Sequence, residues 1–188
     1  MATLKIVYAA VVYSSLALTD LVGIPTVPFT ATGKGTFNAA KANIVVDTRY
    51  ANITDTNGWT LIPPTLNQFA ETFASDLADI TGFSQGRVLE GDGPRESSIF
   101  LTLDNCTEYH DAAGKWTSEA YTIDVKEESI TISGASPLGV WWGTRTLLQQ
   151  VVLHNGSLAV GSGIDSPGWN TRGIFVRSKG PDHSKASG

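Results

Sequence analysis

The sequence predicts a mixed α/β (α+β) domain, and three observations carry this prediction. Apolar residues recur at helical spacing over residues 66–80, and a second helical segment covers residues 137–153. Residues 120–125 and 129–133 alternate between apolar and polar side chains, as half-buried strands do. The length of 188 residues suits one such domain with short extensions.

The first helix has a start signal and a stop signal. Thr65 can cap its amino end, and Gln68 three residues later completes a capping-box pattern. We expect Gly82 to end the helix, because glycine readily adopts the left-handed conformation that follows many helices. Between these signals a single apolar stripe predicts packing against a core; its members are Leu66, Phe69, Ala70, Phe73, Ala74, Leu77 and Ile80.

The second helix, Pro137–Leu153, begins with Ser136 as its cap and proline at its first position, and should stop near residues 155–156. Its apolar residues occupy two sides: Leu138, Trp141, Trp142, Leu148 and Val152 lie on one, and Val140, Leu147 and Val151 on another. A helix that is apolar on most sides is buried on most sides. Only about 35 residues follow it, too few to cover a second face. We therefore expect something outside this chain to pack there.

The strand predictions rest on apolar runs and on alternation. Residues 98–103 are nearly all apolar, which is typical of a central strand covered on both faces. The two alternating segments are joined by three charged residues and predict an antiparallel hairpin. Prolines within residues 21–35 exclude a central strand, so an extended edge or wrapping segment is expected there. The other predicted elements are short strands at 36–38, 43–47 and 158–160, a strand start at 170–176, a loop at 86–96, and turns at 55–58 and 164–168.

Composition excludes several classes of function. The net charge is −5, and lysine and arginine form no run longer than a pair. The sequence therefore lacks the cluster of basic residues that binding to nucleic-acid phosphates requires. His110, His154 and His183 are scattered, and the chain has a single cysteine, so no cluster has metal-ligand spacing. We expect no metal, no cofactor and no nucleic-acid partner.

The amino terminus resembles a secretory signal. Residues 1–17 join a short positive start to an apolar run, with Ser15 and Ala17 at positions −3 and −1 of a cleavage site after Ala17. The run is too short to span a bilayer. The alternative is a buried amino-terminal strand, since β-branched residues are frequent in this segment. The signal predicts a secreted, extracellular protein.

Three glycosylation sequons are compatible with export; their asparagines are Asn52, Asn105 and Asn155. Cys106 lies inside the second sequon. Two interpretations of this cysteine stay open: a buried inert thiol, or half of a disulfide whose partner lies elsewhere. No histidine is placed by a motif to activate it as a nucleophile.

Two linked motifs stand out in the second half of the chain. The first is GASPLGVWWGTRTLLQQ at residues 134–150, and the second is IDSPGWNTRG at residues 164–173. Together they resemble the N-terminal domain of glycoside hydrolase family 20, the β-N-acetylhexosaminidases and chitobiases, especially fungal ones. The first is similar to the family pattern G-A-(S/T)-x-x-G-x-(W/Y/F)-(W/Y)-G-x-x-(T/S)-L-x-Q, and the second to I-x-D-x-P-x-(F/W)-x-x-R-G, which leads into the first strand of the family's catalytic barrel. A weaker resemblance extends over residues 24–103. The resemblance to the family implies a mostly antiparallel sheet with two helices packed on one face. It also implies that those helices lie against the barrel.

The resemblance also implies an activity for a complete relative. Such an enzyme removes terminal N-acetylhexosamine from chitin oligomers or glycoconjugates with retention, and the substrate's acetamido oxygen is the nucleophile. A paired Asp-Glu in the barrel assists, and this chain has no counterpart to that pair. We therefore expect the chain to be non-catalytic, with the barrel, which would pack on Pro137–Leu153, and N-acetylhexosamine-containing glycans as its partners.

Arg172 is the one position that matches a substrate-binding residue of the family. Its guanidinium suits that role because its planar fork donates several directed hydrogen bonds to sugar hydroxyls. The alternative is a solvated arginine at the end of a strand. The family expects L-D-x-x-R further on, and residues 174–179 keep the apolar part but lose the aspartate.

The sequence thus predicts four regions: a signal peptide at 1–17, the α/β domain at 18–165, the start of an otherwise absent (β/α)8 barrel at 166–176, and a disordered, non-homologous tail at 177–188. Two other functions stay open. The chain could be a standalone carbohydrate-binding or regulatory module, for which Trp59, Trp116 and Trp169 are the candidate exposed rings. It could also be a non-functional fragment of a truncated coding sequence.

Overall fold

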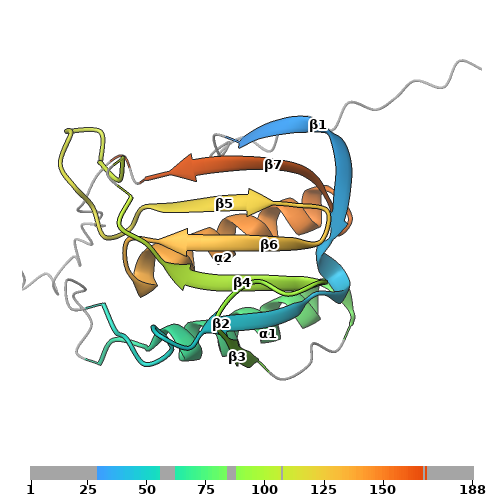
Figure 1. The fold of residues 1–188 in the computed structure, drawn as a ribbon, viewed down its shortest axis with the longest axis horizontal. Helices are drawn as coiled ribbons and strands as arrows, with labels where there is room; N and C mark the ends of the chain where they lie inside the picture. Colours follow the sequence, from blue (N-terminus) through green and yellow to red (C-terminus); the bar gives the residue numbers. More distant parts are fainter. Residues whose placement is uncertain (1–28, 56–61, 84–87, 107, 167, 169–188) are drawn as a thin grey trace, which may run out of the picture.

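A computed structural model describes residues 29–55, 62–83, 88–106, 108–166 and 168. These residues form seven strands, two α-helices and one short 3-10 helix (Figure 1). In chain order they are β1 (Phe29–Asn38), η1 (Ala39–Lys41), β2 (Asn43–Asp47), α1 (Leu66–Thr81), β3 (Leu89–Gly91), β4 (Ser98–Leu103), β5 (Tyr121–Val125), β6 (Ser129–Gly134), α2 (Pro137–Leu153) and β7 (Ser157–Asp165).

All seven strands belong to one sheet with the order β1-β7-β5-β6-β4-β2-β3. The three pairs from β1 to β6 are antiparallel, and the three pairs from β6 to β3 are parallel. The α+β class is confirmed, but the sheet is evenly mixed rather than mostly antiparallel. The physical reason lies in the connections: helix α1 returns the chain between β2 and β3, and such a crossover makes parallel neighbours.

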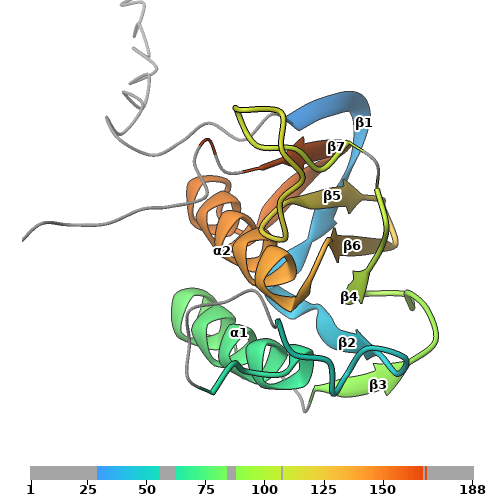
Figure 2. The ribbon, with the colours of Figure 1, turned by 90° about the vertical axis from the view of Figure 1, so that its left-hand side faces the viewer.

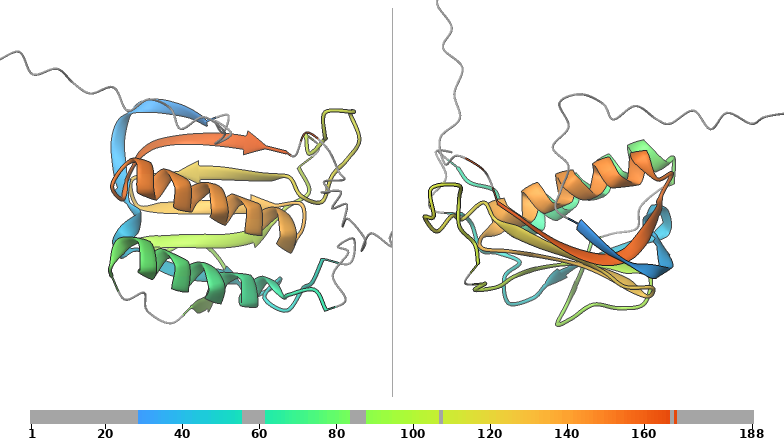
Figure 3. Two further views of the ribbon diagram at one scale, coloured as in Figure 1. Left: turned by 180° about the vertical axis from the view of Figure 1, so that it is seen from behind. Right: turned by 90° about the horizontal axis from the view of Figure 1, so that it is seen from above.

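Both helices lie on the same face of the sheet, as the resemblance implied (Figures 2 and 3). Helix α1 lies against β2, and α2 lies against β5 and β6. The main core fills the space between the layers, and its members include Ile44, Val46, Leu66, Phe73, Leu77, Ile99, Leu101, Ile123, Ile130, Ile132, Val140, Leu147 and Val151. Burial of this apolar surface is the main favourable contribution to folding.

Strand β4 is central and covered on both faces, as its apolar sequence predicted. Ile99 and Leu101 belong to the core beneath the helices. Phe100 points to the opposite face, because successive side chains of a strand alternate, and it is also buried. The predicted hairpin is confirmed as the antiparallel pair β5–β6.

The helix boundaries follow the predicted caps. The Thr65 hydroxyl accepts from the Gln68 amide at 3.2 Å, and the Gln68 side chain accepts from the Thr65 amide at 2.9 Å, which closes the capping box. Gly82 follows α1 with a φ of 71°. Helix α2 begins with Pro137 after the Ser136 cap and ends at Leu153, and positive φ values at Asn155 and Gly156 turn the chain toward β7.

Two strand predictions were wrong in extent. Strand β3 lies within residues 86–96, which were expected to be a loop; it is short and exists because its backbone pairs with β2. Strand β7 runs to Asp165, through the segment that was expected to turn at residue 164. Glycine and serine at 161–163 obscure its alternation, while backbone pairing with both β1 and β5 holds it extended. Strand β1 is an edge strand, in agreement with the prediction for its segment.

Several predictions fall outside the described residues: the signal peptide, the strand start at 170–176 with Arg172, and the tail at 177–188. In the part of the chain that the structure describes, neither helix has the length and apolar character needed to cross a membrane.

Candidate functional site

Helix α2 approaches the sheet closely because glycines of the first motif occupy the contact points. A Cβ on Gly139 would lie 2.3 Å from the carbonyl oxygen of Ala120, and one on Gly143 would lie 2.5 Å from Cγ2 of Ile132. A Cβ on Gly134 of β6 would lie 2.5 Å from the backbone nitrogen of Val140. Real side chains do not fit at such distances. The glycine spacing of the motif is therefore a packing requirement.

Ser136 joins the start of α2 to two loops. Its hydroxyl oxygen accepts from the amides of Leu138 at 3.1 Å and Gly139 at 3.4 Å, as a helix cap does. The same hydroxyl lies 2.8 Å from the carbonyl oxygen of Ser118 and 3.1 Å from Oδ2 of Asp55, and its single proton can be donated to either. The motif serine is buried and holds the beginning of the helix against these two loops.

Tyr121 connects the two motifs. Its hydroxyl lies 2.5 Å from Oγ1 of Thr146 in the first motif, and it donates to Oδ2 of Asp165 in the second motif at 2.9 Å. Burial raises the pKa of the Tyr121 phenol well above its usual range, so the phenol keeps its proton. Because it has one proton, it donates to Asp165 and accepts from Thr146. We call Tyr121, Thr146 and Asp165 the exit network, since the chain leaves β7 at Asp165.

Ser166, the residue after Asp165, also forms a hydrogen bond with another part of the domain. The Ser166 hydroxyl donates to the carbonyl oxygen of His110 at 2.5 Å. Residues 165 and 166 are thus bonded to two different parts of the domain.

A buried carboxylate lies at the carboxyl ends of the parallel strands. Asp47 accepts from Nε of Arg49 at 3.0 Å, from its Nη2 at 2.7 Å, and from the Thr102 hydroxyl at 2.6 Å. The Arg49 side chain first of all, and the Thr102 hydroxyl with it, hold the pKa of Asp47 at about 2, against the opposing effect of burial. A general acid needs a raised pKa. This group therefore ties β2 to β4 and does not have the properties of a catalytic acid.

The helix layer exposes apolar side chains, most of them near the carboxyl ends of the two helices, and among them is Ile80, which was expected in the buried stripe of α1. We call this the outer helix surface, and its members are Ile80, Phe83, Trp142, Val152 and Leu153, each 38–60% exposed. Exposed apolar groups concentrated on one side of a domain often mark an interaction site. Of the face of α2 that was predicted to be uncovered, Trp142 and Val152 are exposed, but Leu148 is buried in the core. Val140, Leu147 and Val151, on the other predicted face, are buried against the sheet.

An aromatic and ionic cluster lies between α1 and α2. Trp141 stacks on Phe69 with ring centroids 5.0 Å apart, and the Arg145 guanidinium lies 3.7 Å from the centroid of the Trp141 ring. Arg145 also forms an ion pair with Asp76 of α1. Within the described ranges, Nη2 of Arg145 is a buried nitrogen with no hydrogen-bond partner.

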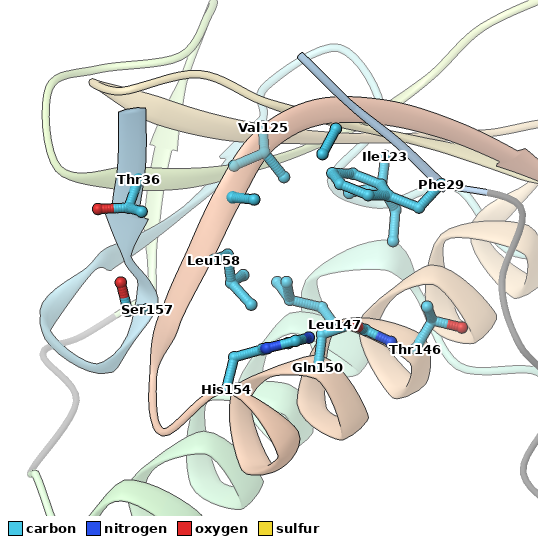
Figure 4. Close-up of a pocket in the computed structure, with 12 residues that line it drawn as sticks. Phe29, Thr36, Ile123, Val125, Thr146, Leu147, Gln150, His154, Ser157 and Leu158 are labelled. Carbon is cyan, nitrogen blue, oxygen red and sulfur yellow. The ribbon is translucent and has the colours of Figure 1, made fainter. Parts of the chain in front are cut away.

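A pocket of about 330 Å³ opens beside the carboxyl half of α2 (Figure 4). Its walls are mostly apolar and come from β1, β5, β7 and α2; they include Phe29, Ile123, Val125, Leu147 and Leu158. Polar side chains of Thr146, Gln150, His154 and Ser157 also line it. Thr146 thus belongs both to this pocket and to the exit network.

The predicted site residues do not converge on one place. Arg172, Trp59 and Trp169 lie outside the described residues. The side chains of Asn52, Asn105 and Asn155 are all exposed and lie in separate loops. Cys106 is a free, half-buried thiol, and Trp116 is 53% exposed. Among the described residues, no group of three or more histidine, cysteine, aspartate or glutamate side chains could hold a metal ion.

Sequence reasoning missed Tyr121 as a junction residue, although it placed this tyrosine on a strand. The available signal was the pair of motifs itself. Tyr121 is the residue that contacts Gly143 and Thr146 of one motif and Asp165 of the other.

The chain resembles parts of much longer solved structures. It is 17% identical to the family 20 β-N-acetylhexosaminidase from Streptomyces coelicolor A3(2), with 76% of this chain and 26% of that chain covered and a TM-score of 0.47. It is 18% identical to the chitobiase from Flavobacterium johnsoniae, with 73% and 20% covered and a TM-score of 0.47. It is 15% identical to the N-acetyl-β-hexosaminidase from Streptomyces plicatus, with 77% and 25% covered and a TM-score of 0.45. The chain thus spans a fifth to about a quarter of the length of these proteins.

A comparison with curated protein sequences gives no match. The family model described as glycosyl hydrolase family 20, domain 2, matches residues 24–162, well over half of the 188 residues. This stretch contains the whole first motif and every strand and helix up to most of β7. The chain therefore belongs to glycosyl hydrolase family 20, of which it carries domain 2.

Proposed function

We propose that this chain is the non-catalytic N-terminal domain of a secreted β-N-acetylhexosaminidase. In the whole enzyme, a catalytic barrel removes terminal N-acetylhexosamine from chitin oligomers or glycoconjugates, and this domain supports the barrel. The observation that carries the proposal is the match of residues 24–162 to domain 2 of the family.

The outer helix surface is the face that packs on the barrel. Val152 is 60% exposed and Phe83 47% exposed, and burying apolar area of this kind stabilises an interface by about 25 cal/mol per Å². Arg145 stacks on Trp141 and pairs with Asp76 of α1, so it holds together the two helices that carry this surface. Arg172 then contributes its guanidinium to sugar hydroxyls in the barrel.

Secretion is part of the same proposal. A glycosylated asparagine must be accessible to solvent, and Asn52, Asn105 and Asn155 all have exposed side chains. Expression in a eukaryotic secretory host, followed by mass measurement before and after deglycosylation, tests it. A chain that stays inside the cell without glycans would contradict export.

The absence of catalysis is tested on the purified chain. After circular dichroism has established that it is folded, the chain is assayed on a chromogenic N-acetylglucosaminide. We expect no turnover above a vector control. Turnover that co-purifies with the folded chain would overturn the non-catalytic assignment.

The supporting role is tested by joining the chain to a family 20 catalytic barrel. We expect the joined protein to melt at a higher temperature than the barrel alone, and a Trp142→Gln, Val152→Gln variant to lose most of that gain. Leu89→Gln is the matched control, since Leu89 has an exposed fraction of 39%, close to the 38% of Trp142, but lies on strand β3 at the sheet edge.

Trp116 favours one alternative, a standalone carbohydrate-binding module. Its ring is half exposed, and exposed indole rings are suited to stacking on sugars. Calorimetry with chitin oligomers on the wild-type chain and on Trp116→Ala distinguishes the two. Binding that disappears in Trp116→Ala would favour the module, and no binding by the wild-type chain would exclude it.

A further inference from the structure

We propose that Tyr121 is a positioning residue: through Thr146 and Asp165 it fixes the direction in which the chain leaves β7. This inference deepens the proposed function, because the segment that leaves β7 is the one that carries Arg172.

The exit network joins three elements that are far apart in the sequence. Tyr121 begins β5, Thr146 lies in the middle of α2, and Asp165 ends β7. Tyr121 and Asp165 are direct partners in the antiparallel β5–β7 pair, so their side chains share the face that the helices cover. The network thus forms where both strands and the helix meet.

Glycines make room for the tyrosine ring. On the other side of Tyr121, its direct partner in β6 is Gly134, which has no side chain. Above it, a Cβ on Gly143 would lie 3.0 Å from Cδ2 of the ring. The ring is therefore held between glycines, and its hydroxyl can reach Thr146 one turn further along α2.

The hydrogen bonds leave little freedom. Tyr121 is 4% exposed and Thr146 is 9% exposed, so losing one partner leaves a buried polar group unsatisfied. The direction of the bonds is determined as well: Thr146 donates to Tyr121, and Tyr121 donates to the Asp165 carboxylate.

Two adjacent residues hold the exit. Asp165, the last residue of β7, accepts from Tyr121, and Ser166, the next residue, donates to the carbonyl oxygen of His110. Two hydrogen bonds from adjacent residues to different parts of the domain restrict the orientation of the chain more than either bond alone.

Hydrogen exchange on the full chain under native conditions tests this inference. Tyr121→Phe removes only the hydroxyl, and we expect exchange at residues 163–166 to rise about tenfold, the factor that corresponds to one lost hydrogen bond. Asp165→Leu should do the same. Asp165→Asn should restore slow exchange, because its amide oxygen still accepts from Tyr121.

Ser98→Ala is the matched control. Ser98 is also buried, but its hydroxyl donates to the carbonyl oxygen of Arg95 and lies at the beginning of β4, at the opposite end of the sheet from the exit. This variant should leave exchange at residues 163–166 within about twofold of wild type, the change expected from stability alone at a distant site.

Two outcomes would overturn the proposal: unchanged exchange at 163–166 in Tyr121→Phe, or a rise of equal size in the amides of β6. If Tyr121→Phe does not fold, Thr146→Val, which keeps the shape of the side chain and removes the donor, gives the same test. Turnover by the chain alone would refute the proposed non-catalytic role without altering these exchange rates, so the two failures are distinguishable.

Discussion

Gly139 of α2 lies directly against the carbonyl group of Ala120, the residue that precedes β5. The two are so close that a Cβ at position 139 would stand 2.3 Å from that oxygen and 3.0 Å from the carbonyl oxygen of Ser118. Both obstacles are backbone atoms, which cannot rotate away. The first turn of α2 therefore sits where it does only because residue 139 has no side chain.

Gly139→Ala should destabilise the domain in spite of alanine's higher helix propensity. The helix must move away from β5, and overpacking of this kind costs about 2 kcal/mol. Gly93→Ala is the control, since a Cβ there meets nothing within 4 Å. Urea denaturation of both variants checks the prediction, and a Gly139→Ala midpoint at or above the wild-type value would contradict it.

Asp47 should make stability depend on pH at the acidic end. Its pKa falls from the ordinary 3.8 to about 2 in the folded chain, so its contribution is complete above the unfolded value and is lost as the pH falls through the folded one. We expect Asp47→Asn to be about 1–2 kcal/mol less stable at pH 6, less than the full shift implies because Arg49 is largely exposed.

The difference between wild type and Asp47→Asn should then shrink between pH 4 and about pH 2. Denaturation curves for the two proteins at pH 6, 4, 3 and about 2 measure this difference. A stability difference that stays constant across this pH range would show that the charge of the Asp47 carboxylate does not contribute to stability.

Ser136→Ala should lower the free energy of unfolding more than Thr65→Ala, although Ser136 and Thr65 both serve as helix caps. Ser136 is 8% exposed and also bonds to Ser118 or Asp55, whereas the bonds of Thr65 are exposed to solvent. Loss of a cap costs about 1 kcal/mol, and the buried site should raise this to about 2 kcal/mol. Thermal or urea unfolding of the two variants decides the order, and equal losses would mean that the extra contacts of Ser136 contribute nothing.

Local signals predicted the helices well. The capping box at Thr65 and the Ser136-Pro137 start act over three or four residues, so they are readable in sequence and the structure reproduces both. The hairpin was also readable, because β5 and β6 are adjacent in sequence and alternate regularly.

The pairing of strands that lie far apart in the sequence was harder to predict. Strand β3 is extended because of backbone pairing with β2, across a helix, and its own side chains are largely exposed. The parallel half of the sheet arises in the same way. The candidate site was also only partly predictable. The motif glycines were evident in the sequence, but the contacts of Tyr121 with Gly143, Thr146 and Asp165 appeared only once β5, α2 and β7 were placed together. Such contacts depend on tertiary structure, which a period of two or 3.6 residues does not encode.

The outer helix surface should make the isolated chain bind hydrophobic dyes or associate with itself. Val152 at 60% exposure and Trp142 at 38% lie on the same helix, with Ile80 and Phe83 at the end of the neighbouring one. We expect dye fluorescence to fall about twofold in the Trp142→Gln, Val152→Gln variant, since it removes the largest exposed apolar groups of α2. Leu89→Gln, with a similarly exposed side chain on β3, should change the signal little.

Sedimentation at two concentrations should show the wild type associating and the double variant monomeric. A wild-type chain that is monomeric and does not bind the dye would mean that this surface is already satisfied within the chain, and would remove the main physical support for docking to a barrel.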